Sequence, residues 1–432
     1  MTARASGTAT TGISAVLVPV ILGGDIGAYS LARTFHEAYG VRSIVLSTVS
    51  TGLVRHSRII TNVVEPAMDD PAVVVARLRS IAAQHPGKKL ILCGSADWLV
   101  RMIIAERAQL DDLYAIPYTT LKNLDLVTDK DHFGRLCAEL GLPHPQTVVY
   151  DLAVGGEVDT AGLRFPVIAK TGNTASYHAV EFEGKKKVFT VGSRDELVEL
   201  LARVAASGYR DKFIIQDFIP GDDSGMRILT TYSDASGKVR WAACGHVLVE
   251  EHTPGALGNP AGIITQHDPA VVEQATRLLE HIGWTGYANF DLKLDPRDGR
   301  TVFFELNPRL GRSNFYITAA GRNTAVPYVR EYVEGKDPDL PGATPAVTDE
   351  HLYTVLPQRL LLRYLAEPAL RAQATRLFRG RTTNPLWYRA ETDPRRIAYL
   401  VIAQLNQFRK YATYYPLAAR DAARSVPVQA VE

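Results

Sequence analysis

Cysteine is scarce in this sequence, and its scarcity argues against two kinds of protein. The 432 residues include three cysteines, and no two of them form a C-x-x-C pair. An odd number without that spacing argues against a disulfide scaffold and against a structural zinc site, and it favours a reducing, cytoplasmic location. Because the neighbours of each cysteine are apolar or small, we predict buried core thiols at Cys93, Cys137 and Cys244.

Long apolar runs and a large net charge are also absent. No stretch reaches the ~20 consecutive apolar residues of a membrane-spanning helix, so we expect no integral membrane segment. The run from Ile13 to Leu22 contains Pro19 and ends in a glycine turn, which favours a buried strand over a signal peptide. Lys and Arg number 48 and Asp and Glu number 46, and the net charge of +2 excludes a strong basic footprint for nucleic acid.

The P-loop motif of Walker-type nucleotidases, G-x-x-x-x-G-K-[ST], is missing as well. A looser pattern, Gly23-Gly24-x-x-Gly27, follows the first apolar run. A dinucleotide site would need an acidic residue after the second strand, where this chain has Leu-Ser-Thr at 46–48. The glycine turn therefore has two interpretations, a contact with a small molecule or tight packing of a strand against a helix.

The first part of the chain shows a strand–helix–strand pattern. Apolar strands are predicted at 16–22, 41–46 and 89–93, and helices at 28–40 and 72–84. Strands that alternate with helices form a parallel sheet with right-handed crossovers. We therefore predict a doubly wound α/β domain over residues 1–125.

From residue 126 the pattern changes to antiparallel α+β. Short strands alternate with explicit turns such as Pro-Gly-Asp at 220–222 and Asp-Pro-Arg-Asp-Gly at 295–299. We predict two further structural parts, 126–212 and 213–335. A proline-rich linker begins at 336, and helical periodicity dominates 350–432, so the last part, 336–432, is predicted as a linker and a helical extension.

A predicted hairpin near residue 300 carries a candidate metal site. If the turn at 295–299 pairs Leu294 with Val302, then Asp291 faces Glu305, with Cβ atoms about 5 Å apart. Opposed carboxylates repel, and a divalent cation with oxygen ligands relieves the repulsion. Asn307 adds a neutral oxygen ligand on the same face. The alternative is a solvated strand face on which a neighbouring lysine compensates the charge.

Two lysines are candidates for phosphate binding. Lys130 stands at the head of a predicted helix, and Lys170 ends an apolar strand, where a charge normally needs a partner. The loop that follows, 171–177, contains Thr171 and Ser176 and is small and hydroxyl-rich, which suits closure over phosphates. A plain turn and surface lysines are the alternatives.

Together these residues resemble the ATP-grasp superfamily. The resemblance rests on Asn-Phe-Asp at 289–291 with Phe-Glu-Leu-Asn-Pro-Arg at 304–309, Val-Ile-Ala-Lys at 167–170, Thr-Asp-Lys at 128–130 and the apolar strand with Pro-Gly at 214–221. It implies an ATP-grasp fold over 126–325, with subdomains at 126–212 and 213–335, and ATP with Mg²⁺, or Mn²⁺, as cofactors. The hinge that holds adenine would comprise Gln216, Asp217, Phe218 and Ile219.

The sequence departs from the family pattern at three places. The loop at 171–177 has less glycine than in many members, and Gln216 stands where an acid is usual. Asn289 replaces an arginine that often precedes the metal aspartate. That change moves the binding of an anionic substrate to Arg309 and Arg227, since guanidinium groups bind carboxylate or phosphoryl oxygens in a bidentate fork. A surface position is the alternative for both arginines.

Most ATP-grasp members join a carboxylate to an amine through an acyl phosphate. Over nearly its full length the chain looks most like the D-aspartate ligase group, through residues 24–33, 220–223 and 383–388. The resemblance implies an amino-acid donor and an amine acceptor on a peptidoglycan precursor. An amino-acid or peptide ligase outside the cell wall and a carboxylase-like enzyme that uses bicarbonate are the alternatives. The segment 350–432 could cap the site, bind the acceptor or form a homodimer contact.

Overall fold

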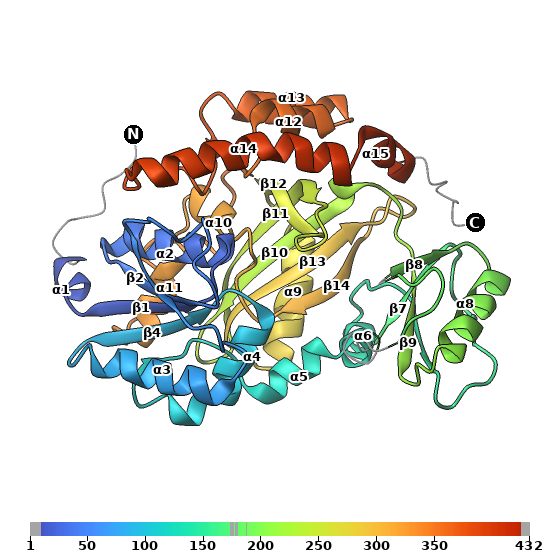
Figure 1. Cartoon of the computed structure of the whole chain (residues 1–432), viewed down its shortest axis with the longest axis horizontal. Coiled ribbons are helices and arrows are strands. Elements are labelled where there is room, and N and C mark those ends of the chain that lie inside the picture. The colour runs from blue at the N-terminus through green and yellow to red at the C-terminus, as the bar shows by residue number, and fades with distance from the viewer. Residues whose placement is uncertain (1–9, 173–176, 178–179, 187, 425–432) are drawn as a thin grey trace.

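The computed structural model describes residues 10–172, 177, 180–186 and 188–424. Three β-sheets lie side by side along the long axis of the molecule, and helices from the end of the chain cross above them (Figure 1). The parallel sheet lies at left, the large mixed sheet in the centre and a small sheet at right. The cysteines Cys93, Cys137 and Cys244 are free and buried, as predicted.

The predicted N-terminal α/β architecture is confirmed. Five parallel strands have the order β3-β2-β1-β4-β5, and α2 begins at the N-cap Asp25, whose carboxylate accepts from the Ala28 N–H, and ends before Gly40. The strands are β1 (Leu17–Leu22), β2 (Ser43–Ser47), β3 (Ile60–Val64), β4 (Lys89–Gly94) and β5 (Tyr114–Ala115), and the helices are α1 (Thr10–Ser14), α2 (Ile26–Tyr39), α3 (Pro71–Ala83), α4 (Asp97–Ala105) and the 3₁₀ turn Arg107–Gln109.

The central sheet has seven strands in the order β14-β13-β10-β11-β12-β15-β16. Apolar residues of α9 pack on one face, and α10, α11 and α2 cover the other. The strands are β10 (Met226–Ser233), β11 (Val239–Glu251), β12 (Asn259–Gln266), β13 (Gly286–Leu294), β14 (Thr301–Asn307), β15 (Leu352–Thr354) and β16 (Thr382–Thr383). The helices are α9 (Pro269–His281), α10 (Phe315–Ala319), α11 (Ala325–Tyr332) and the 3₁₀ turn Asp223–Gly225.

A small antiparallel sheet, β6-β9-β7-β8, forms the lobe at right in Figure 1. Its apolar face buries four leucine and valine side chains of α8. The elements of this lobe are β6 (Thr147–Asp151), β7 (Val167–Thr171), β8 (Val188–Val191), α8 (Arg194–Ala206) and β9 (Lys212–Asp217). Before it come α5 (Leu121–Thr128) and α6 (Lys130–Glu139), whose buried residues pack in the cores of the parallel and central sheets. The segment after β9 joins the small sheet to the central one.

The last part of the chain is mainly helical, as predicted, but it also adds β15 and β16 to the central sheet. Its helices are α12 (Gln358–Tyr364), α13 (Pro368–Leu377), α14 (Pro394–Tyr414) and α15 (Leu417–Arg424). The predicted linker is held against β11, because Arg240 forms ion pairs with Asp337 and Asp339. None of the helices in the described ranges has the length and apolar character needed to cross a bilayer.

Candidate active site

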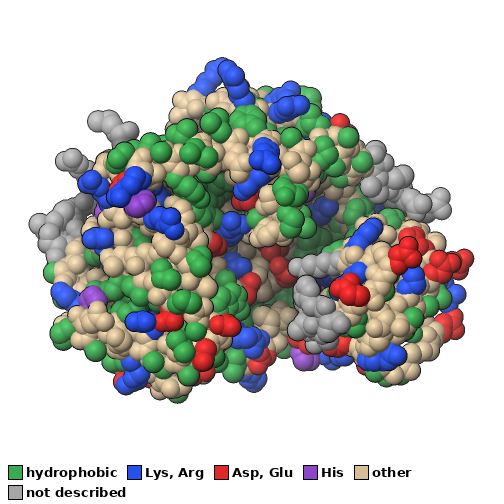
Figure 2. All heavy atoms as spheres, viewed as in Figure 1, with side chains coloured by type: hydrophobic (Ala, Val, Ile, Leu, Met, Phe, Trp, Pro, Cys, Tyr) green, Lys and Arg blue, Asp and Glu red, His purple; other side chains and the backbone are tan. Residues whose placement is uncertain are grey.

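Most of the predicted nucleotide-binding residues and both predicted carboxylates meet at a cavity of about 360 Å³ between the small sheet and the central sheet. The face shown in Figure 2 is hollowed at its centre, and acidic and basic side chains line the hollow. Eight of the residues predicted from the sequence line this cavity: Lys130, Lys170, Gln216, Asp217, Phe218, Ile219, Asp291 and Glu305.

The hairpin of β13 and β14 places the two predicted carboxylates opposite each other. Asp291 pairs with Glu305, and Asn289 pairs with Asn307. The Asn307 Nδ2 group donates to Asp291 Oδ2 at 3.1 Å. Burial, and then the charge of Glu305, raise the pKa of Asp291 well above its ordinary value. The carboxyl groups of Asp291 and Glu305 and the side-chain amide of Asn307 therefore lie close together.

The register at the closed end of the hairpin differs from the prediction. Leu294 pairs with Thr301 and not with Val302, and a β-bulge restores the predicted pairing before Asp291. The extra residue is Phe304. Its neighbour Phe303 belongs to the buried core under α9 whereas Phe304 does not, and both residues border the cavity. The bulge thus breaks the simple alternation expected for β14.

The lysine nearest in sequence to these carboxylates has another role. Lys293 Nζ donates to the carbonyl oxygens of Ile219 and Gly221, each at 2.9 Å. It thereby ties β13 to the segment that follows β9. The alternative of a solvated strand face compensated by Lys293 does not fit this arrangement.

The two predicted phosphate lysines lie together on the opposite wall of the cavity. Lys170 Nζ donates to Gln216 Oε1 at 3.3 Å. Burial, and then the nearby charge of Lys130, lower the pKa of Lys170 to about 8. Removing Lys170 from water without an anionic partner is unfavourable, and a bound phosphate would supply that partner.

The hinge residues line the cavity, but their side chains differ in role. The Asp217 carboxylate accepts from the Arg164 backbone N–H at 2.9 Å and pairs with its guanidinium at 3.0 Å. Asp217 therefore holds the small sheet together. The strand β9 ends at Asp217, so the backbone of Phe218 is no longer part of the ladder.

Thr171, which was predicted to contact phosphates, does not line the cavity. Thr171 is adjacent to Lys170 on β7 and points to the opposite face, where its hydroxyl hydrogen-bonds to that of Tyr209 at 2.5 Å. Successive side chains of a strand alternate between faces, which accounts for this position. Ser176 lies outside the described residues.

The two predicted arginines lie on opposite sides of the central sheet. Arg309 follows β14 and pairs with Asp97 of α4, with Nε 2.9 Å from Oδ1. Arg227 pairs across β10 with Leu292, whose side chain packs in the core under α9, so Arg227 faces away from Asp291. Its guanidinium donates to the Ser224 and Met226 carbonyls. The structure therefore does not bring Arg227 to the cavity.

Comparisons with known proteins agree with this geometry. The family model for the carbamoyl-phosphate synthase L chain, ATP binding domain, matches residues 254–332. The D-aspartate ligase of Enterococcus faecium (strain Aus0004) is 32% identical over 405 residues, which cover 91% of this chain and 96% of that protein. The chain belongs to the ATP-grasp ligases.

Solved structures share the ATP-grasp fold at low identity. An L-amino acid ligase from Bacillus licheniformis superposes with a TM-score of 0.51 at 17% identity, and the match covers 73% of each chain. A biotin carboxylase from Campylobacter jejuni, in a β-γ-ATP complex, gives a TM-score of 0.55 at 12% identity and covers 79% of this chain and 74% of that one. These two likenesses establish the fold of this ATP-grasp ligase and nothing finer.

The carboxylate set of the ligase fits a hard divalent cation. Within the described ranges, no three or more His, Cys, Asp or Glu side chains are grouped to hold a metal. The predicted set has two carboxylates and one amide, and Mg²⁺ typically takes only one or two protein carboxylates beside substrate phosphates. Burial and the charge of Glu305, which raise the pKa of Asp291, disfavour two ionised carboxylates side by side, and a bound cation would favour them.

Sequence reasoning missed one buried acid of the site. Glu250, near the end of β11, lines the cavity, and burial, followed by the charge of Asp223, raises its pKa to about 8. No motif surrounds Glu250, and it is 41 residues from Asp291 in the chain, so no local signal could place it beside the other acids. His144, Met226 and Phe304 are further lining residues that were not predicted.

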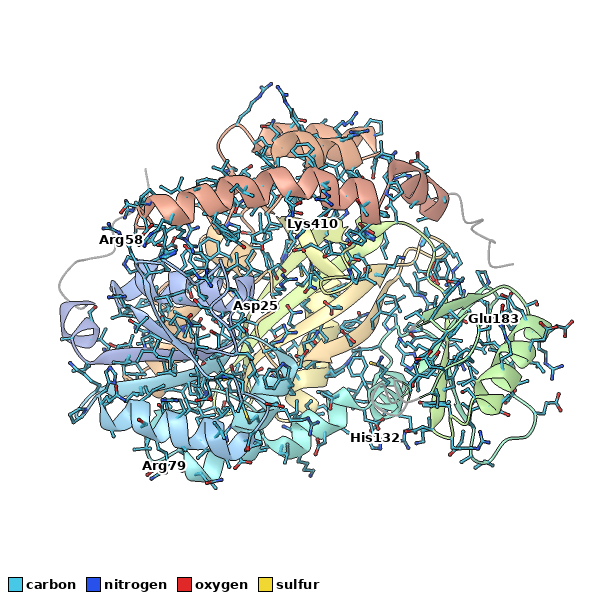
Figure 3. The ribbon with its side chains drawn as sticks, in the orientation of Figure 1. Asp25, Arg58, Arg79, His132, Glu183 and Lys410 are labelled. Carbon is cyan, nitrogen blue, oxygen red and sulfur yellow. The ribbon has the colours of Figure 1, made fainter. Side chains whose placement is uncertain are left out.

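The glycine turn after β1 packs tightly. A Cβ atom at Gly23, whose φ is +118°, would lie 2.1 Å from Ser95 Oγ, so glycine is required there. Beyond it, Asp25 faces the central hollow at the start of α2 (Figure 3). Arg312 Nε lies 3.7 Å from Asp25 Oδ2. Of the two interpretations of this turn, the structure supports tight packing of the strand against its neighbours.

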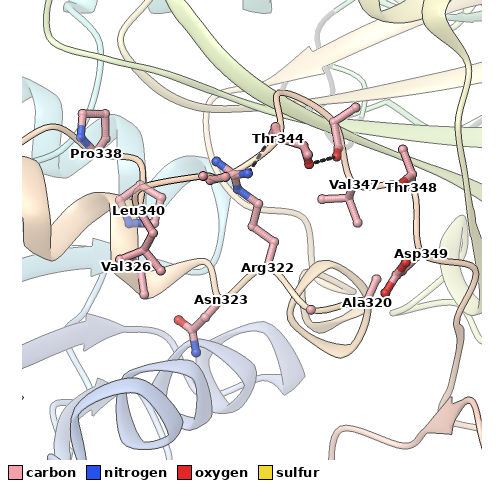
Figure 4. Close-up of a pocket in the computed structure, with 15 residues that line it drawn as sticks. Ala320, Arg322, Asn323, Val326, Pro338, Leu340, Thr344, Val347, Thr348 and Asp349 are labelled. Carbon is pink, nitrogen blue, oxygen red and sulfur yellow. Dashed lines mark hydrogen bonds between the residues drawn. The ribbon is translucent and has the colours of Figure 1, made fainter. Parts of the chain in front are cut away.

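A larger cavity, of about 490 Å³, lies away from these residues, between α11 and the segment 338–349 (Figure 4). Its arginine, Arg322, donates to the Thr344 carbonyl oxygen at 2.6 Å and pairs with Asp339. The remaining lining is mostly small and apolar, including Val326 and Leu340. The cavity of about 360 Å³ therefore holds the charged side chains that nucleotide chemistry needs, although the other cavity is larger.

Proposed function

We propose that this ATP-grasp ligase activates a carboxylate of D-aspartate as an acyl phosphate and joins it to an amine of a peptidoglycan stem peptide. The observation that carries the proposal is a pair of lysines facing a pair of carboxylates across one cavity. The likeness to a D-aspartate ligase over 91% of the chain supports the choice of donor. We also propose that the protein is cytoplasmic. That it forms a homodimer is a prediction.

Different residues of the cavity bind the phosphates, the adenine and the cation of ATP. Lys130 and Lys170 hold the phosphate oxygens, and the backbone at Phe218 and Ile219 reads the adenine edge. Asp291, Glu305 and Asn307 would hold Mg²⁺, or Mn²⁺ in its place. When bound, such a cation would supply positive charge to the phosphate oxygens. The chain itself contributes position and charge.

The donor is placed between the N-terminal sheet and the segment after β14. The turns after β1 and β4 lie at the switch point of the parallel sheet, where ligands of such sheets bind. Two ion pairs cross this gap, Arg309 to Asp97 and Arg312 to Asp25. An amino acid with two carboxylates and one ammonium group can exchange partners with both pairs. Guanidinium forks suit its carboxylates, and the aspartates suit its ammonium group.

The reaction conserves atoms and charge in two steps. A donor carboxylate oxygen attacks the γ-phosphorus, the bond to the β,γ-bridging oxygen breaks, and ADP leaves. The acceptor amine then attacks the acyl carbon, inorganic phosphate leaves, and the nitrogen loses a proton. Lysines that hold the transferred group throughout stabilise its charge in both steps.

Hydroxylamine tests the intermediate without knowledge of the acceptor. With ATP, Mg²⁺ and each D- or L-amino acid in turn, it should trap the acyl phosphate as a hydroxamate with an equal amount of ADP. We expect D-aspartate to be the best donor and AMP to be absent. AMP and pyrophosphate would overturn the acyl-phosphate mechanism. Hydroxamate from another donor would remove only the D-aspartate assignment, and ADP release driven by bicarbonate would favour the carboxylase alternative.

A further inference from the structure

The segment that crosses from the small sheet to the central sheet is anchored on both sides. This crossing loop, residues 218–225, begins where β9 ends and leads into β10. On one side, Lys293 holds the carbonyl oxygens of Ile219 and Gly221. On the other side, the contacts come from the last helices of the chain.

A stacked pair of rings forms the main contact on that second side. The rings of His252 and Tyr415 lie 3.5 Å apart between centroids and are inclined by only 7°. His252 Nε2 donates to Asp223 Oδ2 at 2.9 Å. The same oxygen accepts from the Glu250 backbone N–H at 2.9 Å. Tyr415 thus reaches the crossing loop through the ring of His252. It also reaches the loop directly: burial, and then the charge of Asp223, raise the pKa of the Tyr415 hydroxyl, and a hydrogen bond between Tyr415 and Asp223 adds to the shift.

Further contacts lock the same helices onto this region. Tyr411 donates its hydroxyl to the Glu250 carbonyl oxygen at 2.6 Å, and Tyr364 donates to the Tyr415 carbonyl oxygen at 2.6 Å. Arg424 in α15 lies 3.2 Å from the Asp222 carboxylate. Three C-terminal helices therefore support this region: α15 contacts the crossing loop itself, α14 contacts Glu250 beside it, and α12 holds the backbone of Tyr415.

We infer that the C-terminal helices position the nucleotide hinge, and that Tyr415 is a positioning residue that acts through His252 and Asp223. The inference rests on the proposed contact between the hinge and adenine. The crossing loop sets how the small sheet, which carries Lys170, stands against the central sheet, which carries Asp291. Fixing this loop before ATP binds lowers the cost of ordering it on binding.

The test is a double-mutant cycle read out by nucleotide binding. We compare Tyr415→Leu, His252→Ala and the double variant by calorimetric titration with ADP in MgCl₂. Tyr415→Phe keeps the ring, and the matched control Tyr414→Leu changes a neighbour that is 50% exposed where Tyr415 is 6% exposed. Leucine retains apolar volume at position 415, so the core under α14 stays filled.

The expected result is a loss of ADP affinity without additivity. A loop that adopts its binding conformation a tenth of the time weakens the apparent affinity about tenfold. Tyr415→Leu and His252→Ala should each reach that level, the double variant should go no further, and Tyr414→Leu should bind like the wild type. Tyr415→Phe keeps the stacked ring and loses only the hydroxyl, so it should retain more affinity than Tyr415→Leu. Unchanged affinity in Tyr415→Leu, or losses that multiply in the double variant, would overturn the inference.

Melting temperature without nucleotide separates positioning from general stability. A merely structural role predicts that Tyr415→Leu lowers the melting temperature while the folded fraction binds ADP normally, and that outcome would also overturn the inference. ADP binding does not depend on which amino acid is ligated. If the hydroxamate assay shows that D-aspartate is not the donor, the ADP titration therefore still tests the role of Tyr415.

Discussion

Lys170 should make nucleotide binding sensitive to pH near neutrality. Burial and the charge of Lys130 lower its pKa from 10.5 to about 8. A bound phosphate chain adds negative charge beside the ammonium group and raises this pKa again. A neutral Lys170 must therefore take up a proton when ATP binds, and affinity should fall as the pH rises through 8.

The size of the effect follows from the pKa. With a pKa of about 8, Lys170 is charged in roughly nine-tenths of molecules at pH 7 and in roughly one-tenth at pH 9. ATP binding should therefore weaken about tenfold between these pH values, or by about 1.4 kcal/mol. Titration calorimetry in buffers of different ionisation enthalpy should show proton uptake rising from about 0.1 to about 0.9 per ATP over the same range.

Two variants identify the group responsible. Lys170→Met should bind ATP weakly and lose the rise in proton uptake. Lys130→Met should move the rise to higher pH, because removing the neighbouring charge lets the pKa of Lys170 recover part of its loss. Proton uptake that is flat between pH 7 and 9 in the wild type, or that is unchanged in Lys170→Met, would refute the argument.

The same pKa has a consequence of opposite sign for stability. Because the folded-state pKa lies below the unfolded value, Lys170 lowers the free energy of unfolding at pH 7, and this penalty disappears as the pH rises from about 8 to 10.5. The shift corresponds to at most about 3 kcal/mol at 1.36 kcal/mol per unit, and solvent screening of the partly exposed side chain reduces it. Lys170→Met should raise the melting temperature of the ligand-free protein and diminish the rise caused by ATP, as measured by calorimetry. Equal ATP-induced rises in both proteins would rule out a phosphate contact.

Three further predictions concern other residues of the site. Asp291→Asn and Glu305→Gln should each abolish ADP release at saturating Mg²⁺ while leaving the melting temperature equal or higher, since each removes one of two repelling charges; a wild-type rate in either would disprove the metal assignment. Arg309→Lys should raise the KM of the amino-acid donor about tenfold or more, because a lysine cannot form the bidentate fork, and should leave the KM of ATP unchanged. Steady-state ADP release measures both values, and an unchanged donor KM would place the donor elsewhere. Thr171→Val should leave the KM of ATP in the same assay unchanged because the Thr171 hydroxyl points to Tyr209, and a large rise would restore our original assignment.

Local sequence was enough to predict the carboxylate pair because the pairing is set within one hairpin. Asp291 and Glu305 are separated by a single turn, and apolar residues alternate with them on the buried face. The bulge at Phe304 could not be predicted, because either Phe303 or Phe304 can fill the apolar position under α9. The predicted pairing of the two acids was correct, although its starting point at Leu294 was wrong by one residue.

The face on which Arg227 lies could not be predicted because both faces of β10 are covered. Six of its eight residues are buried, so the strand shows no polar–apolar contrast that would orient it. Thr171 is a different case. A strand that points Lys170 into the cavity must point the next side chain away, so alternation alone excluded Thr171 from the phosphate site. Glu250 reaches the site through the packing of β11 against the rest of the sheet, and no local sequence pattern indicates that position.

The two pairs of like charges explain why the site is both costly to fold and selective. Lys130 with Lys170, and Asp291 with Glu305, each oppose folding through repulsion and burial. Lys130 lies on α6 and Lys170 on β7, whereas the two acids lie on β13 and β14. The charge of Glu305 offsets only part of the lowering of the Lys170 pKa. An ATP molecule with its cation presents negative charge to the lysines and positive charge to the carboxylates at once. Either component alone satisfies one pair and leaves the other uncompensated. The nucleotide and the cation should therefore strengthen each other's binding, and this coupling must disappear when either Asp291 or Glu305 is neutralised.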